Sequence, residues 1–448
     1  MAQQRDHRTL KRVLGLAFGV AIVVGGVVGQ GILRTPGIVA AGAPDPSLIL
    51  ALWAFGAVVT AIDAMSIVEL GSAIPKAGGP YVFVERAFGR FGGFLTGWLD
   101  AGNLIITLAY IAVVVAEYVA RFDAFAGLPV GPLAAGFVML FGLINALPTR
   151  IGGGLQNVSS AIKVAALLAF AVICFAFRGE PGAEAPAAAG EPNALALTFV
   201  GLALAANAIQ QTYFGANTAV YFSEEVTAPE QNLARATFIG VAVVAAVYLL
   251  VNAALLNVLS VPEMAKSNLP AADALDRALG SGGALAATLF ALFSVAAVGN
   301  VTLMQVSRTL FAMGRAGDLP RSLSFVLGTG APVVALGVVA VLGALLASTG
   351  AYNRLIMIAA PILALINLLV ALSALRMRMK EPGLARPYRM PLYPAPSIFS
   401  ILFNLALMAF FIASDVENTR WSVLFIVTAV PVYFAMKRLS AAGSSAVS

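Results

Sequence analysis

Apolar runs alternate with short polar segments along the whole chain of 448 residues. Each run has roughly the 20 residues that an α-helix needs to cross the hydrocarbon core of a bilayer, and Gly, Pro and charged residues mark its ends. The pattern predicts an all-α polytopic membrane protein with twelve transmembrane helices, at residues 13–39, 47–73, 91–120, 131–147, 154–177, 195–222, 236–259, 283–305, 331–348, 353–376, 397–414 and 420–438.

Three polar or terminal segments have patterns of their own. Residues 178–194 are rich in Ala, Pro and Glu, which is typical of a flexible connection. Residues 261–280 predict a short surface helix with Asn268 and Pro270 near its middle. The first apolar run follows basic residues but is longer than the apolar region of a signal peptide, so we interpret it as a retained first helix.

Composition supports the interpretation as a membrane protein and excludes disulfide and His/Cys metal sites. The chain is 60% hydrophobic and 11% charged, whereas a soluble protein has about 25% charged residues. The single cysteine, Cys174, and single histidine, His7, exclude an internal disulfide and a His/Cys metal cluster. We expect no cofactor and no metal. The net charge of +6 is spread between the spans, so it indicates a lipid bilayer and not a nucleic acid as the partner.

The distribution of lysine and arginine predicts the orientation. With both termini on one side, nineteen of the 27 basic residues lie on that side and seven on the other. Basic residues accumulate in cytoplasmic loops. We therefore expect a multi-pass protein of the cytoplasmic (inner) membrane with both termini in the cytoplasm.

The first predicted helix contains four glycines within seven residues, in the sequence VVGGVVGQGILRTPG at 23–37. Each glycine inside a helix costs up to ~1 kcal/mol relative to alanine. Gly25 and Gly29 have the spacing of a close helix–helix contact, which is one interpretation of the cluster. Gly29 and Gly31, however, flank the polar Gln30 at mid-depth, and this pattern favours an unwound helix.

The sixth predicted helix has a polar interruption, QQTYFGANTAVYFSEE at 210–225. It occupies the place in helices 6–10 that the glycine cluster occupies in helices 1–5, and such paired interruptions indicate the binding site of a secondary transporter. A half-helix starting near Gln30 presents free N–H groups to a carboxylate. A half-helix ending near Tyr213 presents free carbonyl groups to an ammonium group. Together they suit a zwitterionic amino acid.

Four segments resemble the amino acid–polyamine–organocation (APC) superfamily of transporters. They are GGVVGQGILRTPG on helix 1, ELGSAIPKAGGPYVFVERAFGRFGGFLTGWLD at 69–100, TYFGANTAVYFSEEVTAPEQNLARA at 212–236 and SRTLFAMGRAGDLP at 307–320. The resemblance implies the LeuT-type fold, a 5+5 inverted repeat plus two C-terminal helices. The chain would then consist of a cytoplasmic tail at 1–12, a first repeat at 13–177, an extracellular loop at 178–194, a second repeat at 195–376, a cytoplasmic loop at 377–396, helices 11 and 12 at 397–438, and a cytoplasmic tail at 439–448.

The resemblance also implies the residues of the substrate site. Backbone amides of the superfamily's helix 1 break hold the substrate carboxylate, while helix 6 carbonyls hold the amino group and its side chains shape the pocket. Gln30 replaces the usual small hydroxyl residue, and Gln211 stands where the superfamily often has an aromatic lid. The positions that match are Val28, Gly29, Gln30, Gly31, Gln211, Tyr213, Phe214, Gly215 and Asn217.

Ionisable residues inside a span are costly, at least ~2.5–3.5 kcal/mol each, and indicate function. Lys163 lies about ten residues into helix 5, too deep to reach the interface easily. The resemblance places it where sodium-coupled relatives bind Na⁺, so it either couples a proton to transport or tethers helix 5 to the helix 1 break. Asp63 on helix 2 either pairs within the bundle or reaches the substrate. Glu224 and Glu225 are expected to cap or pair at the cytoplasmic face and help close a gate.

These features predict a secondary active transporter of amino acids working by alternating access, with a proton as coupling ion. Helix 6 lacks an acidic side chain at its break, which favours neutral L-amino acids. The alternatives are an amino acid exchanger and a polyamine or cationic amino acid transporter. An intramembrane enzyme would need a nucleophile with a base or a metal site, and the spans contain no recognisable one. A channel would need a repeated filter. We therefore expect neither.

Overall fold

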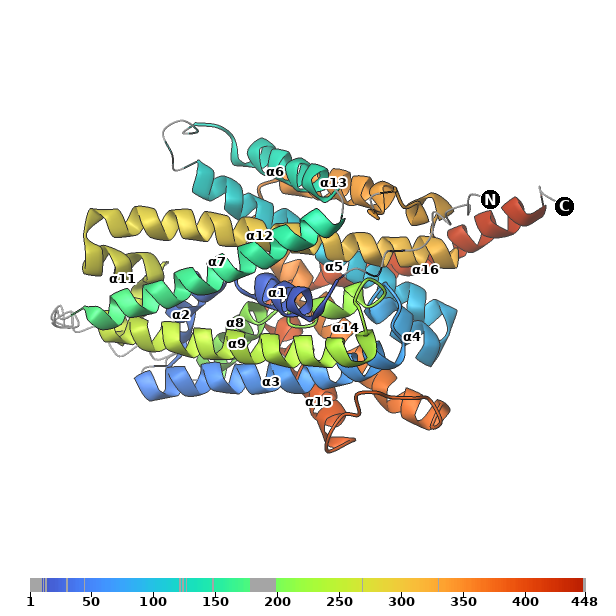
Figure 1. Ribbon diagram of the computed structural model, residues 1–448, viewed down its shortest axis with the longest axis horizontal. Helices are drawn as coiled ribbons and strands as arrows, with labels where there is room; N and C mark the ends of the chain where they lie inside the picture. The colour runs from blue at the N-terminus through green and yellow to red at the C-terminus, as the bar shows by residue number, and fades with distance from the viewer. Residues whose placement is uncertain are drawn as a thin grey trace.

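The computed structural model describes residues 10–445 apart from 11, 13, 30, 44, 121, 123–124, 126, 147–148, 178–198, 268 and 329. Within these residues the chain forms helices joined by loops (Figure 1). The helices are α1 (Leu16–Val27), α2 (Gly31–Gly42), α3 (Pro46–Ala73), α4 (Pro80–Phe88), α5 (Arg90–Val119), α6 (Val130–Asn145), α7 (Thr149–Ala176), α8 (Phe199–Thr212), η2 (Thr218–Phe222), α9 (Pro229–Val258), α10 (Val261–Lys266), α11 (Pro270–Leu279), α12 (Ser281–Ala316), η3 (Arg321–Ser324), α13 (Val333–Ala347), α14 (Tyr352–Lys380), α15 (Ala395–Ser414) and α16 (Val416–Ser445).

A polytopic all-α membrane protein is confirmed at the level of its helices. Every one of the twelve predicted ranges overlaps helix in the structure. Among the described residues, eight helices are long and apolar enough to cross a membrane, or nine if α1 and α2 count as one bent span. Helices α6 and α13 are apolar but shorter, at 16 and 15 residues, and α8 ends after 14. The count of twelve spans and the inverted repeat therefore stay predictions.

Some helix ends differ from those that the hydropathy pattern indicates. Helix α12 continues to Ala316 instead of ending at 305, because Arg308 is neutralised by an ion pair inside the protein. The predicted single surface helix at 261–280 is two helices, α10 and α11, separated before Pro270. Helix α4 was not predicted at all, since nine residues between two spans are too few for a clear periodicity. The predicted connection at 178–194 lies outside the described residues.

Helix α5 forms the centre of the molecule. In the most apolar stretch of α5, 89% of the residues are buried inside the protein, whereas the corresponding share for α16 at the periphery is 11%. It packs against α12, α14, α4 and α6. On opposite sides of the view in Figure 1, α3 runs beside α9 and α6 beside α13. The broken pair α1 and α2 lies inside this frame, in contact with α7, α8, α9 and α12.

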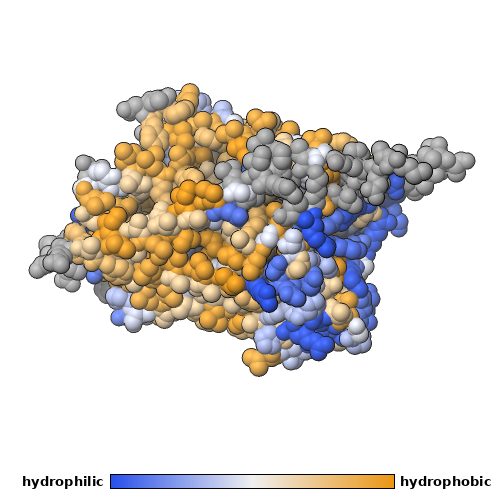
Figure 2. Space-filling view, in the orientation of Figure 1, coloured by the Kyte–Doolittle hydropathy of each residue, from blue (hydrophilic) through white to orange (hydrophobic). Residues whose placement is uncertain are grey.

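Hydrophilic residues gather at one end of the molecule. Figure 2 shows an apolar surface over the middle and a hydrophilic region toward the end that carries α4. Ion pairs of the described residues concentrate at this end, including Arg90–Asp318 and Arg315–Glu224. Helices α10 and α11 lie at the opposite end (Figure 1).

Candidate substrate site at two broken helices

The first break separates α1 from α2. Helix α1 ends at Val27, Val28 has an extended backbone (φ −70°, ψ 99°), and α2 begins at Gly31. The two helix axes meet at 48°. The interruption predicted from the glycine cluster is therefore present, although Gln30 itself lies outside the described residues.

Side chains from three other helices bind the carbonyl groups that this break leaves without helical partners. Lys163 on α7 is fully buried, and its Nζ donates to the carbonyl oxygens of Gly25 (2.9 Å) and Val28 (2.7 Å). Ser294 on α12 donates to the same Val28 oxygen (3.1 Å), and the hydroxyl of Tyr248 on α9 donates to that of Val27 (3.0 Å). Hydrogen bonds from α7, α9 and α12 thus hold the backbone of the break in place.

The second break follows α8. The helix ends at Thr212, residues 213–217 form turns, and a short 3₁₀ helix begins at Thr218. Gly215 has φ +102°, and a Cβ atom added to it would lie 2.6 Å from the carbonyl oxygen of Gly26. The two breaks therefore touch at a point that only glycine fits.

The start of α2 also lies against the end of α8. A Cβ atom on Gly31 would lie 2.7 Å from Cγ2 of Thr212. One turn further along α2, the hydroxyl oxygens of Thr35 and Thr212 are 2.7 Å apart, within hydrogen-bond distance. The N-terminus of one half-helix and the C-terminus of another consequently meet in a single place.

A cavity of about 370 Å³ opens at this meeting point. Of the residues predicted for the substrate site, Gly29, Gly31, Gln211 and Phe214 line it. Sequence reasoning missed further lining residues, and those with polar or charged side chains include Arg34, Thr35, Tyr110 and Asn207. A signal for Asn207 was available, because it lies four residues before Gln211 and so on the same helix face.

Three more of the predicted residues surround a second, smaller cavity of about 70 Å³. Tyr213, Gly215 and Asn217 line it, together with Asp63 on α3. Phe214 lines both cavities and so stands between them. The structure therefore divides the predicted site into two chambers, while Val28 and Lys163 line neither and act on the break through hydrogen bonds.

The segment after the second break forms ion pairs at the end of the molecule that carries α4. Glu225 forms a buried ion pair with Arg308 on α12 (2.9 Å), and Glu224 pairs with Arg315 (2.7 Å). The backbone of Leu14, just before α1, bonds to Glu225 and Thr227. The prediction that the two glutamates form pairs is confirmed, and their partners both lie on α12.

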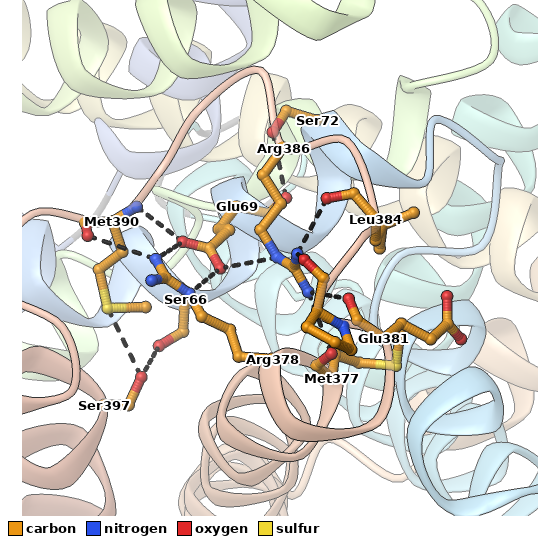
Figure 3. Close-up of polar contacts among 11 residues, drawn as sticks. Ser66, Glu69, Ser72, Met377, Arg378, Glu381, Leu384, Arg386, Met390 and Ser397 are labelled. Carbon is orange, nitrogen blue, oxygen red and sulfur yellow. Dashed lines mark hydrogen bonds and ion pairs between the residues drawn. The ribbon is translucent and has the colours of Figure 1, made fainter.

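A second polar cluster joins α3 to the loop between α14 and α15 (Figure 3). The buried carboxylate of Glu69 accepts two hydrogen bonds from Arg378 (2.8 and 2.6 Å) and one from the backbone N–H of Met390 (2.6 Å). Arg386 lies 3.4 Å from the same carboxylate and donates to carbonyl groups of Met377, Glu381 and Leu384. This cluster fixes the loop, and none of its residues lines either cavity.

Comparison with known proteins finds amino acid transporters that match almost the whole chain. The chain is 30% identical over 443 residues to the large neutral amino acids transporter small subunit 2 of Rattus norvegicus, covering 95% of this chain and 80% of the relative. It is 27% identical over 450 residues to the serine/threonine exchanger SteT of Bacillus subtilis (strain 168), covering 97% and 99%. It is also 27% identical over 445 residues to the b(0,+)-type amino acid transporter 1 of Mus musculus, covering 95% and 88%.

The match to a family extends over nearly the whole chain. Residues 14–436 match the sequence profile of a family described as amino acid permease. This match confirms the resemblance to the APC superfamily, and it confirms that the protein is a transporter and not an enzyme. The chain belongs to the amino acid permease family.

Proposed function

We propose that this protein is a secondary transporter of amino acids in which the substrate bridges the two helix breaks. The observation that carries the proposal is the cavity of about 370 Å³ at the start of α2 and the end of α8. Free N–H groups at a helix start favour a carboxylate, and free carbonyl groups at a helix end favour an ammonium group. Gly29 and Gly31 leave the backbone accessible, since neither has a side chain. Alternating access would then expose this cavity to each side in turn, with both termini in the cytoplasm.

The lining of the larger cavity favours a neutral amino acid. Among the described residues that line it, Arg34 is charged and none is acidic. A cationic side chain would have no partner there, and burying it unpaired is costly. The names of two relatives, a large neutral amino acids transporter subunit and a serine/threonine exchanger, point in the same direction.

We propose further that Lys163 couples a proton to substrate movement. Its ammonium group binds two carbonyls of the first break. Loss of a proton removes both a charge and a donor from this anchor, so the protonation state of Lys163 would change how firmly the break is held. Exchange of one amino acid for another is the second candidate, because one relative is named as an exchanger; in that case Lys163 acts as a permanent tether.

Uptake into proteoliposomes tests the function. The purified protein is reconstituted and offered a panel of labelled neutral, cationic and acidic amino acids, with unlabelled amino acid on the opposite side. We expect unlabelled amino acid on the opposite side to accelerate uptake of labelled neutral amino acids, because the binding site of a carrier reorients across the membrane faster when substrate is bound. Absence of accelerated exchange for every amino acid would contradict the proposal.

The same vesicles test the role of Lys163 when an inward proton gradient is imposed. We expect the gradient to stimulate uptake by the wild type and to lose its effect in Lys163→Gln. The matched control is Lys266→Gln, which changes an exposed lysine on α10. A Lys163→Gln protein that keeps full stimulation would exclude the lysine as coupling residue, and exchange without stimulation in the wild type would favour the exchanger.

A further inference from the structure

The smaller cavity contains oxygen atoms that have no donor. It lies between α3, α5, α12, α14 and the unwound segment after α8. Three of its side chains, Asp63, Asn103 and Asn217, each carry a buried Oδ1 atom without a hydrogen-bond partner among the described residues. Asp63 is 8% exposed and Asn103 is 2% exposed. Buried oxygens without partners are costly, and their convergence on one cavity points to a ligand that supplies positive charge.

The charge in this cavity is also unbalanced. The cavity contains two carboxylates, and no lysine or arginine is found among its described lining residues. Asp100 is satisfied by hydroxyl groups, accepting from Tyr221 (2.7 Å) and Thr309 (2.8 Å). Asp63 faces Ser400, and its Oδ2 is at 3.5 Å from the amide of Gln210, the limit of a hydrogen bond. Among the described residues of the cavity, neither carboxylate has a countercharge, and Asp63 is the one with an oxygen that lacks a hydrogen-bond partner.

Gln305, Lys163 and Arg308 each donate to acceptors other than the three oxygens without partners. The amide nitrogen of Gln305 donates to Thr218 (3.1 Å). Lys163 is bound to the first break, and Arg308 to Glu225. Three neutral or acidic oxygens without hydrogen-bond partners make a poor site for an anion. They make a good site for a cation, for which carboxylate and amide oxygens beside unwound backbone are common ligands in transporters.

We propose that this cavity binds a small monovalent cation, with Asp63 supplying the charge and Asn103 and Asn217 supplying neutral oxygen ligands. The volume of about 70 Å³ suits an alkali-metal ion or a primary ammonium group. Because Phe214 separates this chamber from the larger one, the cation occupies a site distinct from the bridging site of the substrate backbone. This proposal does not depend on which amino acid the protein transports.

Thermal unfolding of the purified full chain in detergent tests the proposal without any transport assay. Melting temperatures are measured in NaCl, KCl, methylammonium chloride and choline chloride at equal ionic strength, since a ligand that binds the folded state raises the melting temperature. We expect a saturating rise relative to choline, which is too large for the cavity. A rise in NaCl or KCl identifies an alkali-metal ion, and a rise confined to methylammonium identifies an ammonium group.

Two variants locate the effect. Asp63→Asn keeps the shape of the side chain but removes its charge, and we expect it to lose the cation response, whereas Asp276→Asn on the exposed face of α11 keeps it. Asn103→Leu removes an oxygen without a partner, so it should be no less stable than the wild type in choline chloride and yet lose the response. Equal melting temperatures of the wild type in all four salts, or a full response in Asp63→Asn or Asn103→Leu, would overturn the proposal.

Discussion

Gly215 and Gly31 stand where two stretches of the chain approach more closely than any side chain allows. At Gly215 the limiting neighbour is the backbone of Gly26, and at Gly31 it is the side chain of Thr212. The glycine cluster on the first helix was visible in the sequence, and it predicted a break. The neighbours that make each glycine necessary are about 180 residues away along the chain, and the sequence pattern contains no information about them.

Substitution of Gly31 tests the backbone site. Gly31→Leu places atoms against Thr212 and over the N–H groups that start α2. We expect this variant to reach the membrane but to bind substrate at least about tenfold more weakly. That change corresponds to a loss of about 1.4 kcal/mol or more in binding free energy. The measurement is equilibrium binding of a labelled amino acid to purified protein. Gly337→Leu is the control, because Gly337 lies on α13 with no neighbour within 4 Å of an added Cβ. Normal binding by Gly31→Leu would refute the site.

At the scale of elements, the unwound segments do more than expose backbone groups. The stretch after α8 leads into Glu224 and Glu225, whose ion pairs connect it to α12, while the N-terminal side of α1 bonds to the same stretch through Leu14. Both breaks are thereby linked to the ion pairs of α12 at one end of the molecule. Hydropathy predicted α12 to end before Arg308, because it counts the charge of an arginine and not the partner that neutralises it.

The buried Glu225–Arg308 pair should stabilise this arrangement. Glu225→Gln leaves the Arg308 side chain, which is 4% exposed, without its countercharge. We expect the free energy of unfolding to fall by about 3–5 kcal/mol, because removing one partner leaves a buried charge uncompensated. Glu417→Gln is the control, since the Glu417–Arg420 pair is 71% and 65% exposed and such a pair contributes at most about 1 kcal/mol. Thermal unfolding in detergent compares the two, and equal destabilisation would contradict the role of Glu225.

At the scale of the whole molecule, the two ends differ in character. The end with α4 carries many charged residues and the ion pairs of α12, while the other end carries α10 and α11. The excess of basic residues around the first end is the property from which the sequence predicts a cytoplasmic location.

Cysteine labelling tests this orientation. The single native cysteine, Cys174, is fully buried, so it provides a background that a membrane-impermeant maleimide should not label. We expect Lys266→Cys on α10 to be labelled in intact cells, and Lys437→Cys near the end of α16 to be labelled only after the membrane is opened. The reverse pattern would show that the termini face outward.

The sequence by itself determined the class of the protein, the approximate positions of most of its helices and the two places where helices unwind. These properties depend on local quantities: the length of an apolar run, the helix-breaking effect of glycine, and the cost of polar groups in lipid. Tertiary structure decided which residues share a chamber. Asp63, Asn103 and Asn217 come from separate elements, and Phe214 separates chambers that the sequence presents as one site. Such assignments depend on the packing of whole helices against one another, which no local pattern contains.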